Sequence, residues 1–358
     1  DLKGSFKYSV RYKGITTHFG LGGVHGARKD IYTSNDEYVI MSSDVTSFYP
    51  NLAIRNKWSP LHIPKEEFCD QYEWFFDERK KIPKSDPRNY VYKIVLNSTY
   101  GLSNDENSFL YDPELTMRIT LNGQLSLMML YEMICERIPN AVPLMQNTDG
   151  LETRIPRKYV DEYMEICKEW EDITNLQLEH DTYQKVVLAD VNNYIAVTEG
   201  ENFKTKCKGR FVFEDLPLHK NKSFLCVRKA MYNYFIYGKD PEQSIKENTN
   251  IFDFCGGVKA KGDWKFFEEH IVNGIHKRDT LQKTVRYYIS NLGSKTVKVH
   301  SIDGRVAQVE AGKWLQTMFI DYIEKPFEEY DINYDFYIKK AKKEIEALEP
   351  ITNQLQLF

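Results

Sequence analysis

The alternation of apolar and polar positions predicts strands and helices interspersed along the whole chain. The first strong strand pattern covers residues 37–45 and delivers Asp44 at its end. Helical patterns follow, and a turn bracketed by Pro83 and Pro87 joins two of them into a helical hairpin. The predicted helices of this half cover residues 47–56, 66–81, 88–102 and 114–138.

The rest of the chain is predicted to be mixed, with a hairpin first and helices last. Residues 142–155 alternate around an Asp149-Gly150 turn, which is a strong β-hairpin signal. After a helix that begins near residue 158, we expect two strands and then mixed helical segments. The strands are expected near 185–197 and 204–213, a lysine-rich helix over 334–348, and a tail over 351–358.

The helix predicted over 88–102 has two different faces. At about 100° per residue, one side carries Lys93, Asn97, Tyr100 and Gly101, and the opposite side carries Val91, Val95, Ser98 and Leu102. We expect the apolar side to dock on the protein, so that Lys93 and Asn97 face a cleft. Taken alone, a surface helix with one exposed lysine explains the same pattern.

Two aspartates follow predicted strands. Asp44 could simply cap the next helix, and Asp149 could simply be a turn residue. If both lie at adjacent strand ends, their charges repel unless a cation joins them. Mg²⁺ held by two carboxylates and by phosphate oxygens would satisfy both, and a pair of such ions supports nucleotidyl transfer to a primer 3′-hydroxyl.

Composition narrows the class of protein. A chain of 358 residues allows one large domain or two or three subdomains around a shared cleft. The net charge of −4 gives no overall attraction to nucleic acid, so a nucleic-acid surface has to be local. Six scattered cysteines without a C-x-x-C pair argue against zinc and a disulfide framework, and favour a reducing interior. The sequence contains no run of about 18 apolar residues, so no membrane span is expected.

Three clusters resemble motifs A, B and C of family B DNA polymerases. They are Asp44-Val45-Thr46-Ser47-Phe48-Tyr49-Pro50, Lys93-Ile94-Val95-Leu96-Asn97-Ser98-Thr99-Tyr100-Gly101 and Asn147-Thr148-Asp149-Gly150. Their order and spacing resemble a short-fingered, bacteriophage-like member of that family. The resemblance implies an α+β, right-hand architecture with an antiparallel-sheet palm, short two-helix fingers and a mostly helical thumb.

The resemblance also implies a division of the chain. Its parts would be a template-side segment with the first part of the palm (1–58), fingers (59–102), the rest of the palm (103–215), a thumb (216–350) and a flexible clamp-binding tail (351–358).

Carried over residue by residue, the motifs imply roles in the reaction. Asp44 and Asp149 would be the catalytic metal ligands, assisted by the Val45 carbonyl, for two Mg²⁺ ions, with Mn²⁺ as an alternative. Tyr49 would exclude a 2′-hydroxyl and so select deoxynucleotides. The other implied nucleotide contacts are the Ser47 and Phe48 amides with the triphosphate, Arg79 and Lys93 with the β- and γ-phosphates, and Asn97 and Tyr100 beside the nascent pair.

Further segments resemble DNA contacts of the same family. Gly22 and Gly23 lie in a segment similar to Y-x-G-G, where the backbone approaches the template, although a plain loop explains the glycines equally. Tyr194 matches the tyrosine of K-x-Y beside the primer terminus. Lys206 and Lys208 would contact phosphates, or would be a solvated strand end.

Motif C departs from the family pattern. Asn147 stands where the family has an aspartate, and Gly150 stands where it has a serine. We therefore keep two hypotheses. The first is a template-directed DNA polymerase that adds deoxynucleoside triphosphates to a primer. The second is a catalytically weak or inactive polymerase-fold scaffold that binds DNA in a replication complex.

The end of the chain resembles the Q-L-x-L-F peptide that binds the bacterial β sliding clamp. Gln354, Leu355, Leu357 and Phe358 would be the contacts, unless the tail folds back onto the thumb. No exonuclease domain fits before residue 15, so we expect a separate chain or domain to supply proofreading. The resemblance implies a bacterial cytoplasm, or that of a phage's bacterial host.

Overall fold

In the computed structural model, the chain forms two compact units, Asp1–Lys206 and Cys207–Phe358, each described here by itself. The structure describes residues 7–201, 203–216, 220, 222–309 and 316–349. The predicted clamp-binding residues, 354–358, lie outside the described residues. Within the described residues, no helix is both long enough and apolar enough to cross a membrane.

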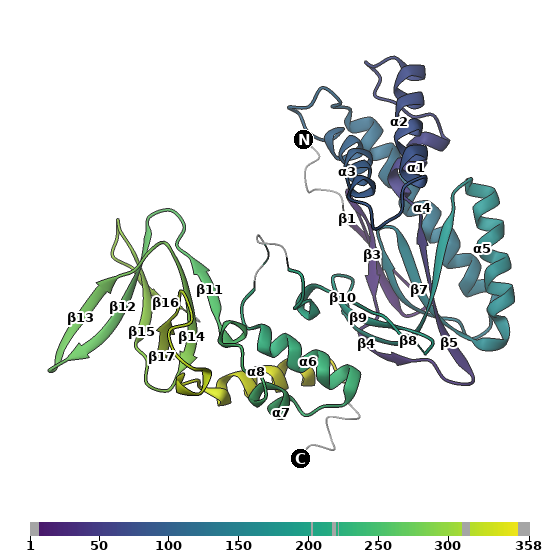
Figure 1. Ribbon diagram of the computed structural model, residues 1–358. Helices are drawn as coiled ribbons and strands as arrows, with labels where there is room; N and C mark the ends of the chain where they lie inside the picture. The colour runs from purple at the N-terminus through teal and green to yellow at the C-terminus, as the bar shows by residue number, and fades with distance from the viewer. Residues whose placement is uncertain (1–6, 202, 217–219, 221, 310–315, 350–358) are drawn as a thin grey trace. The chain divides into compact units, whose positions relative to one another are not determined.

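The first unit is built on one large sheet (Figure 1). Its strand order is β1-β2-β3-β6-β7-β5-β8-β9-β10, and β4 pairs with β8 off this path. The pairings with a described register are antiparallel, and the prediction of an antiparallel sheet is thus confirmed. The strands are β1 (Lys7–Tyr12), β2 (Ile15–Gly20), β3 (Gly23–Ala27), β4 (Asp30–Thr33), β5 (Tyr38–Val45), β6 (Val142–Asn147), β7 (Gly150–Pro156), β8 (Leu178–Asp190), β9 (Asn193–Thr198) and β10 (Thr205–Lys208).

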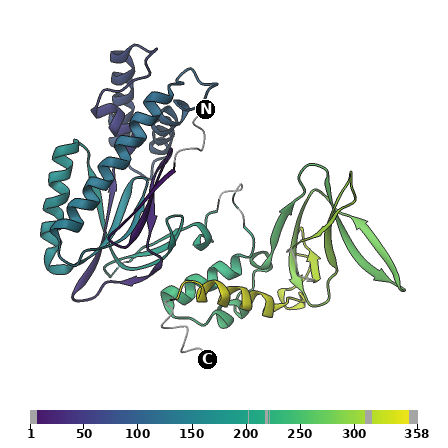
Figure 2. The same cartoon turned by 180° about the vertical axis from the view of Figure 1, so that it is seen from behind.

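Among the described residues of the first unit, five α-helices accompany this sheet. Two of them, α4 and α5, run along one of its faces, and the other three gather beyond one end of it in both views (Figures 1 and 2). They are α1 (Phe48–Arg55), α2 (Lys65–Lys80), α3 (Pro87–Leu102), α4 (Pro113–Arg137) and α5 (Val160–Thr174). The four helices predicted before residue 140 are thus confirmed, with ends within about one residue.

Helix starts are precise because the sequence caps them. Asp86 precedes Pro87 at α3, and its carboxylate accepts the Arg88 N–H at 2.9 Å. Asp112 precedes Pro113 at α4 and accepts the Leu115 N–H at 3.0 Å. A capping carboxylate followed by proline at the first helical position favours a helix start, and such a cap contributes about 1 kcal/mol.

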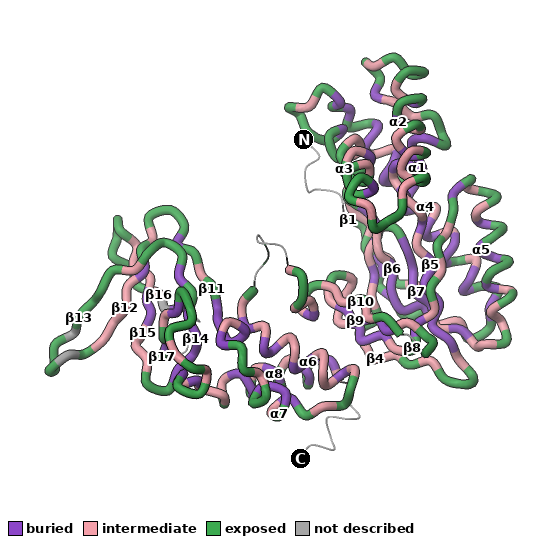
Figure 3. Tube along the Cα trace, in the orientation of Figure 1, coloured by how far each residue is buried: buried purple, intermediate pink, exposed green. Residues whose placement is uncertain are grey.

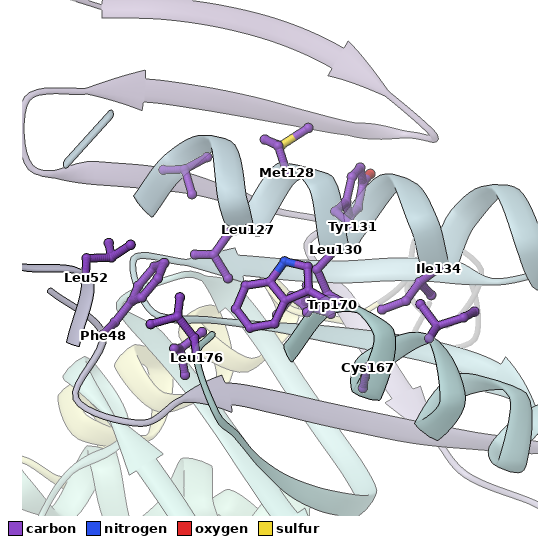
Figure 4. Close-up of a cluster of buried hydrophobic side chains, with 14 of the residues drawn as sticks. Phe48, Leu52, Leu127, Met128, Leu130, Tyr131, Ile134, Cys167, Trp170 and Leu176 are labelled. Carbon is purple, nitrogen blue, oxygen red and sulfur yellow. The ribbon is translucent and has the colours of Figure 1, made fainter. Parts of the chain in front are cut away.

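The main core lies between the sheet and α4 and α5. Trp170 of α5 is fully buried there, and its indole N–H donates to the Ser126 carbonyl at 2.8 Å. Figure 4 shows its ring surrounded by side chains of α4, α1 and the segment after α5. The side chain of Phe48 belongs to this core at 4% exposure, so only the backbone of Phe48 can face a ligand.

The predicted packing face of α3 is wrong. Val91 and Leu102, expected to dock, are 58% and 39% exposed, whereas Leu96 is fully buried. The packed face is set by α2, because the Tyr72 hydroxyl donates to the Leu96 carbonyl at 2.8 Å. Asn89 of α3 also turns inward and donates to the Ile82 carbonyl at 2.7 Å.

Where it is described, the second unit combines three α-helices with two small antiparallel sheets (Figure 1). The sheets have the orders β11-β14-β17 and β13-β12-β15-β16. The helices are α6 (Leu225–Tyr237), α7 (Pro241–Lys246) and α8 (Tyr334–Glu346). The strands are β11 (Gly256–Lys259), β12 (Trp264–Val272), β13 (Ile275–Thr280), β14 (Thr284–Ser290), β15 (Lys295–His300), β16 (Val306–Gln308) and β17 (Gln316–Phe319).

The expectation of a mostly helical segment over 216–350 is therefore wrong. Its middle is a run of strands, and β12 and β13 form a hairpin around an Asn273-Gly274 turn. This dipeptide is a strong hairpin signal that the sequence interpretation overlooked. The strand expected near 185–197 is two strands, β8 and β9, and the strand expected over 204–213 ends at Lys208.

Candidate active site

A cavity of about 750 Å³ opens where β5 meets α1 and the α2–α3 hairpin. Figure 3 shows the contrast between the buried strands below and the more exposed helical hairpin. The cavity combines cations with carboxylates, which suits a negatively charged ligand bound with metal ions. It is lined by Asp44, Val45, Thr46, Ser47, Phe48, Tyr49, Pro50, Phe76, Arg79, Lys80, Ile82, Lys84, Asn89, Lys93, Asn97, Tyr100, Thr148, Asp149 and Glu179.

Strand pairing brings the two motif aspartates to one place. Asp44 lies opposite Gly150 across the β5–β7 ladder, so the β6–β7 turn meets the end of β5. The Val45 N–H donates to the Asp149 carbonyl at 2.7 Å, which fixes that turn. Both aspartates line the cavity.

The environment disfavours a negative charge on Asp44. Burial raises the pKa of Asp44 above its usual value, and repulsion from Asp149 raises it further. Lys206 opposes both effects, because its ammonium nitrogen lies 3.6 Å from the Asp44 Oδ2. A divalent cation would relieve the same repulsion.

Glycine at position 150 gives the Asp44 carboxylate its place. A Cβ atom built on Gly150 would lie 2.0 Å from the Asp44 Oδ1 and 3.0 Å from the Ser43 carbonyl oxygen. Any side chain at 150 would therefore displace the Asp44 carboxylate. This close approach explains why glycine, rather than the serine of the resembled motif, stands at position 150.

The start of α1 faces the cavity together with Arg79. Ser47 precedes the helix in the left-handed region, with φ at 46°. Its hydroxyl accepts a hydrogen bond from the Arg79 guanidinium at 2.8 Å. The first N–H groups of a helix point out of its N-terminus, so the backbone of Ser47 and Phe48 borders a place suited to a phosphate.

Tyr49 is wedged between the sheet and the helices. Its hydroxyl donates to the Gly22 carbonyl at 2.9 Å, and its ring centre lies 4.7 Å from that of Tyr100. A Cβ atom on Gly123 of α4 would lie 3.0 Å from the Tyr49 ring, so a side chain there would press on the ring. Contacts on several sides thus fix the ring at the cavity wall.

The helical hairpin supplies the cations. Arg79 comes from α2 and Lys93 from α3, and Asn97 and Tyr100 lie one turn or two further along α3. Lys93 and Asn97 line the cavity as predicted, although a different face of α3 is packed. Lys93 and Asn97 lie next to Leu96 and Tyr100 around the helix, so they border the packed face.

Several lining residues were missed by the sequence interpretation. Lys80 adjoins Arg79 on α2, and Lys84 lies in the turn between α2 and α3, where its ammonium pairs with Glu179 at 3.0 Å. Glu179 reaches the cavity because it pairs with Asp44 across β5 and β8. Thr148 is inside motif C, and its hydroxyl contacts the His25 ring at 2.9 Å. Only the lysines had a local signal, namely their closeness to Arg79.

Of the residues predicted to contact DNA, some lie beside the cavity and one is buried in a second core. The turn at Gly22 and Gly23 contacts the site itself, since a Cβ atom on Gly23 would lie 2.9 Å from Thr148. Tyr194 is 3% exposed and packs in a second core. Lys206 and Lys208 are both on β10, and Lys206 faces Asp44. Contact of these residues with DNA stays a prediction.

The site offers Mg²⁺ a partial set of oxygen ligands. Among the residues that the structure describes, no group of three or more histidine, cysteine, aspartate or glutamate side chains could hold a metal ion. Asp44, Asp149 and the Val45 carbonyl instead offer a partial set of oxygens. Mg²⁺ typically takes one or two carboxylates and completes its shell with water and substrate phosphates, so this partial set fits it.

Comparison with known proteins supports the fold. No protein-family profile and no curated protein matches the chain. The structure is similar to that of the family B DNA polymerase from the hyperthermophilic archaeon Pyrobaculum calidifontis, with a TM-score of 0.51 at 12% sequence identity. The match covers 97% of this chain and 48% of that one, so this chain spans about half the length of the polymerase. The chain thus has a fold similar to part of a family B DNA polymerase.

Proposed function

We propose that the protein is a template-directed DNA polymerase that adds deoxynucleoside triphosphates to a primer 3′-hydroxyl. The observation that carries the proposal is the single cavity that gathers Asp44, Asp149, the start of α1, Arg79, Lys93 and Tyr49. Such a cavity offers metal ligands, phosphate donors and a wall for a sugar. The fold similarity to a family B DNA polymerase adds support.

The proposed mechanism assigns the charges of the site. Asp44, Asp149 and the Val45 carbonyl would hold two Mg²⁺ ions, which, when bound, supply activation of the 3′-hydroxyl and neutralisation of the leaving pyrophosphate. Arg79 and Lys93 bind the β- and γ-phosphates through charge-assisted hydrogen bonds. The N–H groups at the start of α1 bind the remaining phosphate oxygens.

Sugar selection is assigned to Tyr49. Its ring is fixed by the Gly22 carbonyl, by Tyr100 and by the close approach of Gly123. A fixed ring cannot retreat from an added 2′-hydroxyl, so a ribonucleotide would meet a steric barrier. Asn97 and Tyr100 border the same wall and are assigned to the nascent base pair.

Three further parts of the proposal rest on the sequence resemblance. The Gln354–Phe358 peptide would bind a bacterial-type sliding clamp, and a separate chain or domain would supply proofreading. The relationship would be to bacteriophage-like polymerases acting in a bacterial cytoplasm. The partners of the proposed polymerase would thus be primer-template DNA, the clamp and the proofreading chain or domain.

One observation favours the alternative of a weakly active or inactive scaffold that binds DNA. Asn147 replaces an expected carboxylate, and its side-chain oxygen accepts the Thr148 N–H at 3.1 Å. This oxygen is thus used within the turn, and the site has one charge fewer than the family pattern. A protein with such a site could bind primer-template without extending it.

Primer extension separates the two functions. The wild-type chain, with Mg²⁺ or Mn²⁺, should extend a labelled primer in the order dictated by the template. Asp149→Ala should abolish extension, whereas Asp172→Ala, a change to an exposed carboxylate of α5, should leave it intact. Binding of primer-template without any incorporation would support the scaffold, and equal extension by Asp149→Ala would refute the site assignment.

A further inference from the structure

Lys206 occupies an unusual place for a residue assigned to DNA. It lies on β10, and β8 and β9 separate β10 from β5 in the sheet order. Its ammonium nitrogen nevertheless approaches the Asp44 Oδ2 to 3.6 Å, with the two side chains 49% and 40% exposed. A lysine from the strand at one end of the sheet order thus serves as a counter-ion to a proposed metal ligand.

The surrounding charges hold this ammonium in place. Asp44 is its ion-pair partner, and the carboxylate of Glu152 attracts the same ammonium. Glu152 is 5% exposed and lies two residues after Gly150 on β7. A lysine side chain carries a full positive charge at neutral pH, so Lys206 places a cation beside the site.

A lysine and a divalent ion compete for the same carboxylate. A metal ion bound to Asp44 would sit about 2 Å from the oxygen, and hence within about 6 Å of the ammonium in its present position. Repulsion between a single and a double charge at that separation is large enough, even at a water-like dielectric, to weaken ion binding about tenfold. The four-carbon stem of lysine is flexible, so the ammonium can move away.

We propose that Lys206 is an exchangeable counter-ion of Asp44, which pairs with the carboxylate before the metal binds and pairs with a primer-strand phosphate afterwards. This inference rests on the proposed polymerase function. It makes the binding of DNA and the binding of metal mutually favourable. A phosphate that draws Lys206 away from Asp44 raises the affinity for the ion, and by linkage the ion raises the affinity for DNA by the same factor.

The test is a titration of the full chain with Mn²⁺, followed by the electron paramagnetic resonance signal of the free ion and without turnover. Without DNA, Lys206→Met should bind Mn²⁺ about tenfold more tightly than the wild type, since a repelling charge is removed. Lys204→Met is the matched control, because Lys204 is exposed and precedes the same strand. Its affinity for Mn²⁺ should equal that of the wild type.

Adding a primer-template whose primer lacks a 3′-hydroxyl tests the exchange itself. DNA should tighten Mn²⁺ binding in the wild type and in Lys204→Met, and should do so much less in Lys206→Met. Lys206→Gln is a second variant that removes the charge but keeps a polar end, and it should behave like Lys206→Met. Circular dichroism establishes that each variant is folded.

The outcomes distinguish this inference from the proposed function. Unchanged or weaker Mn²⁺ affinity in both folded Lys206 variants overturns the exchange and leaves the metal site standing. If Asp149→Ala binds Mn²⁺ as tightly as the wild type, the metal site of the proposed function is itself overturned, and the exchange with it.

Discussion

Replacing Gly150 with alanine should harm catalysis far more than folding. The new Cβ atom would lie 2.0 Å from the Asp44 Oδ1, whereas nonbonded carbon and oxygen atoms need more than 3 Å, so the carboxylate has to move by about 1 Å or more. The clashing atom is the end of a side chain, which can rotate. The remaining close contact, 3.0 Å to the Ser43 carbonyl oxygen, requires only a small adjustment.

The magnitude follows from the role of the displaced atom. A 1 Å misplacement of a catalytic group can reduce the rate about 100-fold, so Gly150→Ala should lower single-turnover primer extension by about that factor. The loss of folding free energy should stay within the roughly 1–3 kcal/mol typical of an overpacked site. Rapid-quench extension at saturating nucleotide, together with thermal unfolding, measures the two effects.

A matched glycine provides the control. Gly257 of β11 has no atom within 4 Å of a built Cβ, so Gly257→Ala should leave both extension and unfolding nearly unchanged. Extension by Gly150→Ala at the wild-type rate would refute the assignment of the Asp44 carboxylate to the reacting centre. A drop in stability large enough to unfold the chain would show that the site is rigid, contrary to the reasoning above.

Four other predictions follow from the site and the tail. Tyr49→Ala should admit ribonucleotides in extension assays, whereas Tyr49→Phe keeps the ring and should still exclude them; unchanged selectivity in the alanine variant would remove the gate. Lys93→Ala should raise KM for the nucleotide about 10- to 100-fold, as expected for a lost charge-assisted hydrogen bond, while Lys81→Ala, whose lysine pairs with Glu78 on the surface, should not. Asp44→Asn should raise the unfolding temperature at neutral pH, because the raised pKa of Asp44 means that its ionised form destabilises the fold. This gain should vanish as the pH falls below the carboxyl pKa of the unfolded chain, about 4. A lower unfolding temperature of the variant at pH 7 would contradict the prediction. Deleting residues 354–358 should abolish stimulation by a bacterial clamp and leave basal extension intact; loss of basal extension would mean that the tail is structural.

Local signals explain what the sequence predicted well. The helical hairpin was located to about one residue because Pro83 and the Asp86-Pro87 pair mark the turn between its helices, and the Asp112-Pro113 pair likewise marks the start of α4. The aspartates of the first and third motifs were placed at strand ends, and strand pairing then brought them into one cavity. Caps, turns and strand ends depend on a few neighbouring residues, so a single sequence can reveal them.

Non-local pairing explains what was missed. Glu179 enters the cavity only because β8 pairs with β5, and Lys206 reaches Asp44 only because the sheet continues through β9 to β10. A strand pattern shows which residues share a face but not which strand becomes the neighbour. The prediction of the packed face of α3 was wrong for a related reason. Tyr72 on another helix and the inward-turned Asn89 determine which face of α3 is packed.

The central claim is that Asp44 and Asp149 together hold the ions of a polymerase site. Its most direct test is an anomalous-scattering map of crystals containing the chain, Mn²⁺, a primer-template and a nonhydrolysable deoxynucleoside triphosphate. The account predicts Mn²⁺ bound by both carboxylates and by the triphosphate, with Arg79 and Lys93 on the outer phosphates. Mn²⁺ bound elsewhere, or a triphosphate outside this cavity, would contradict it.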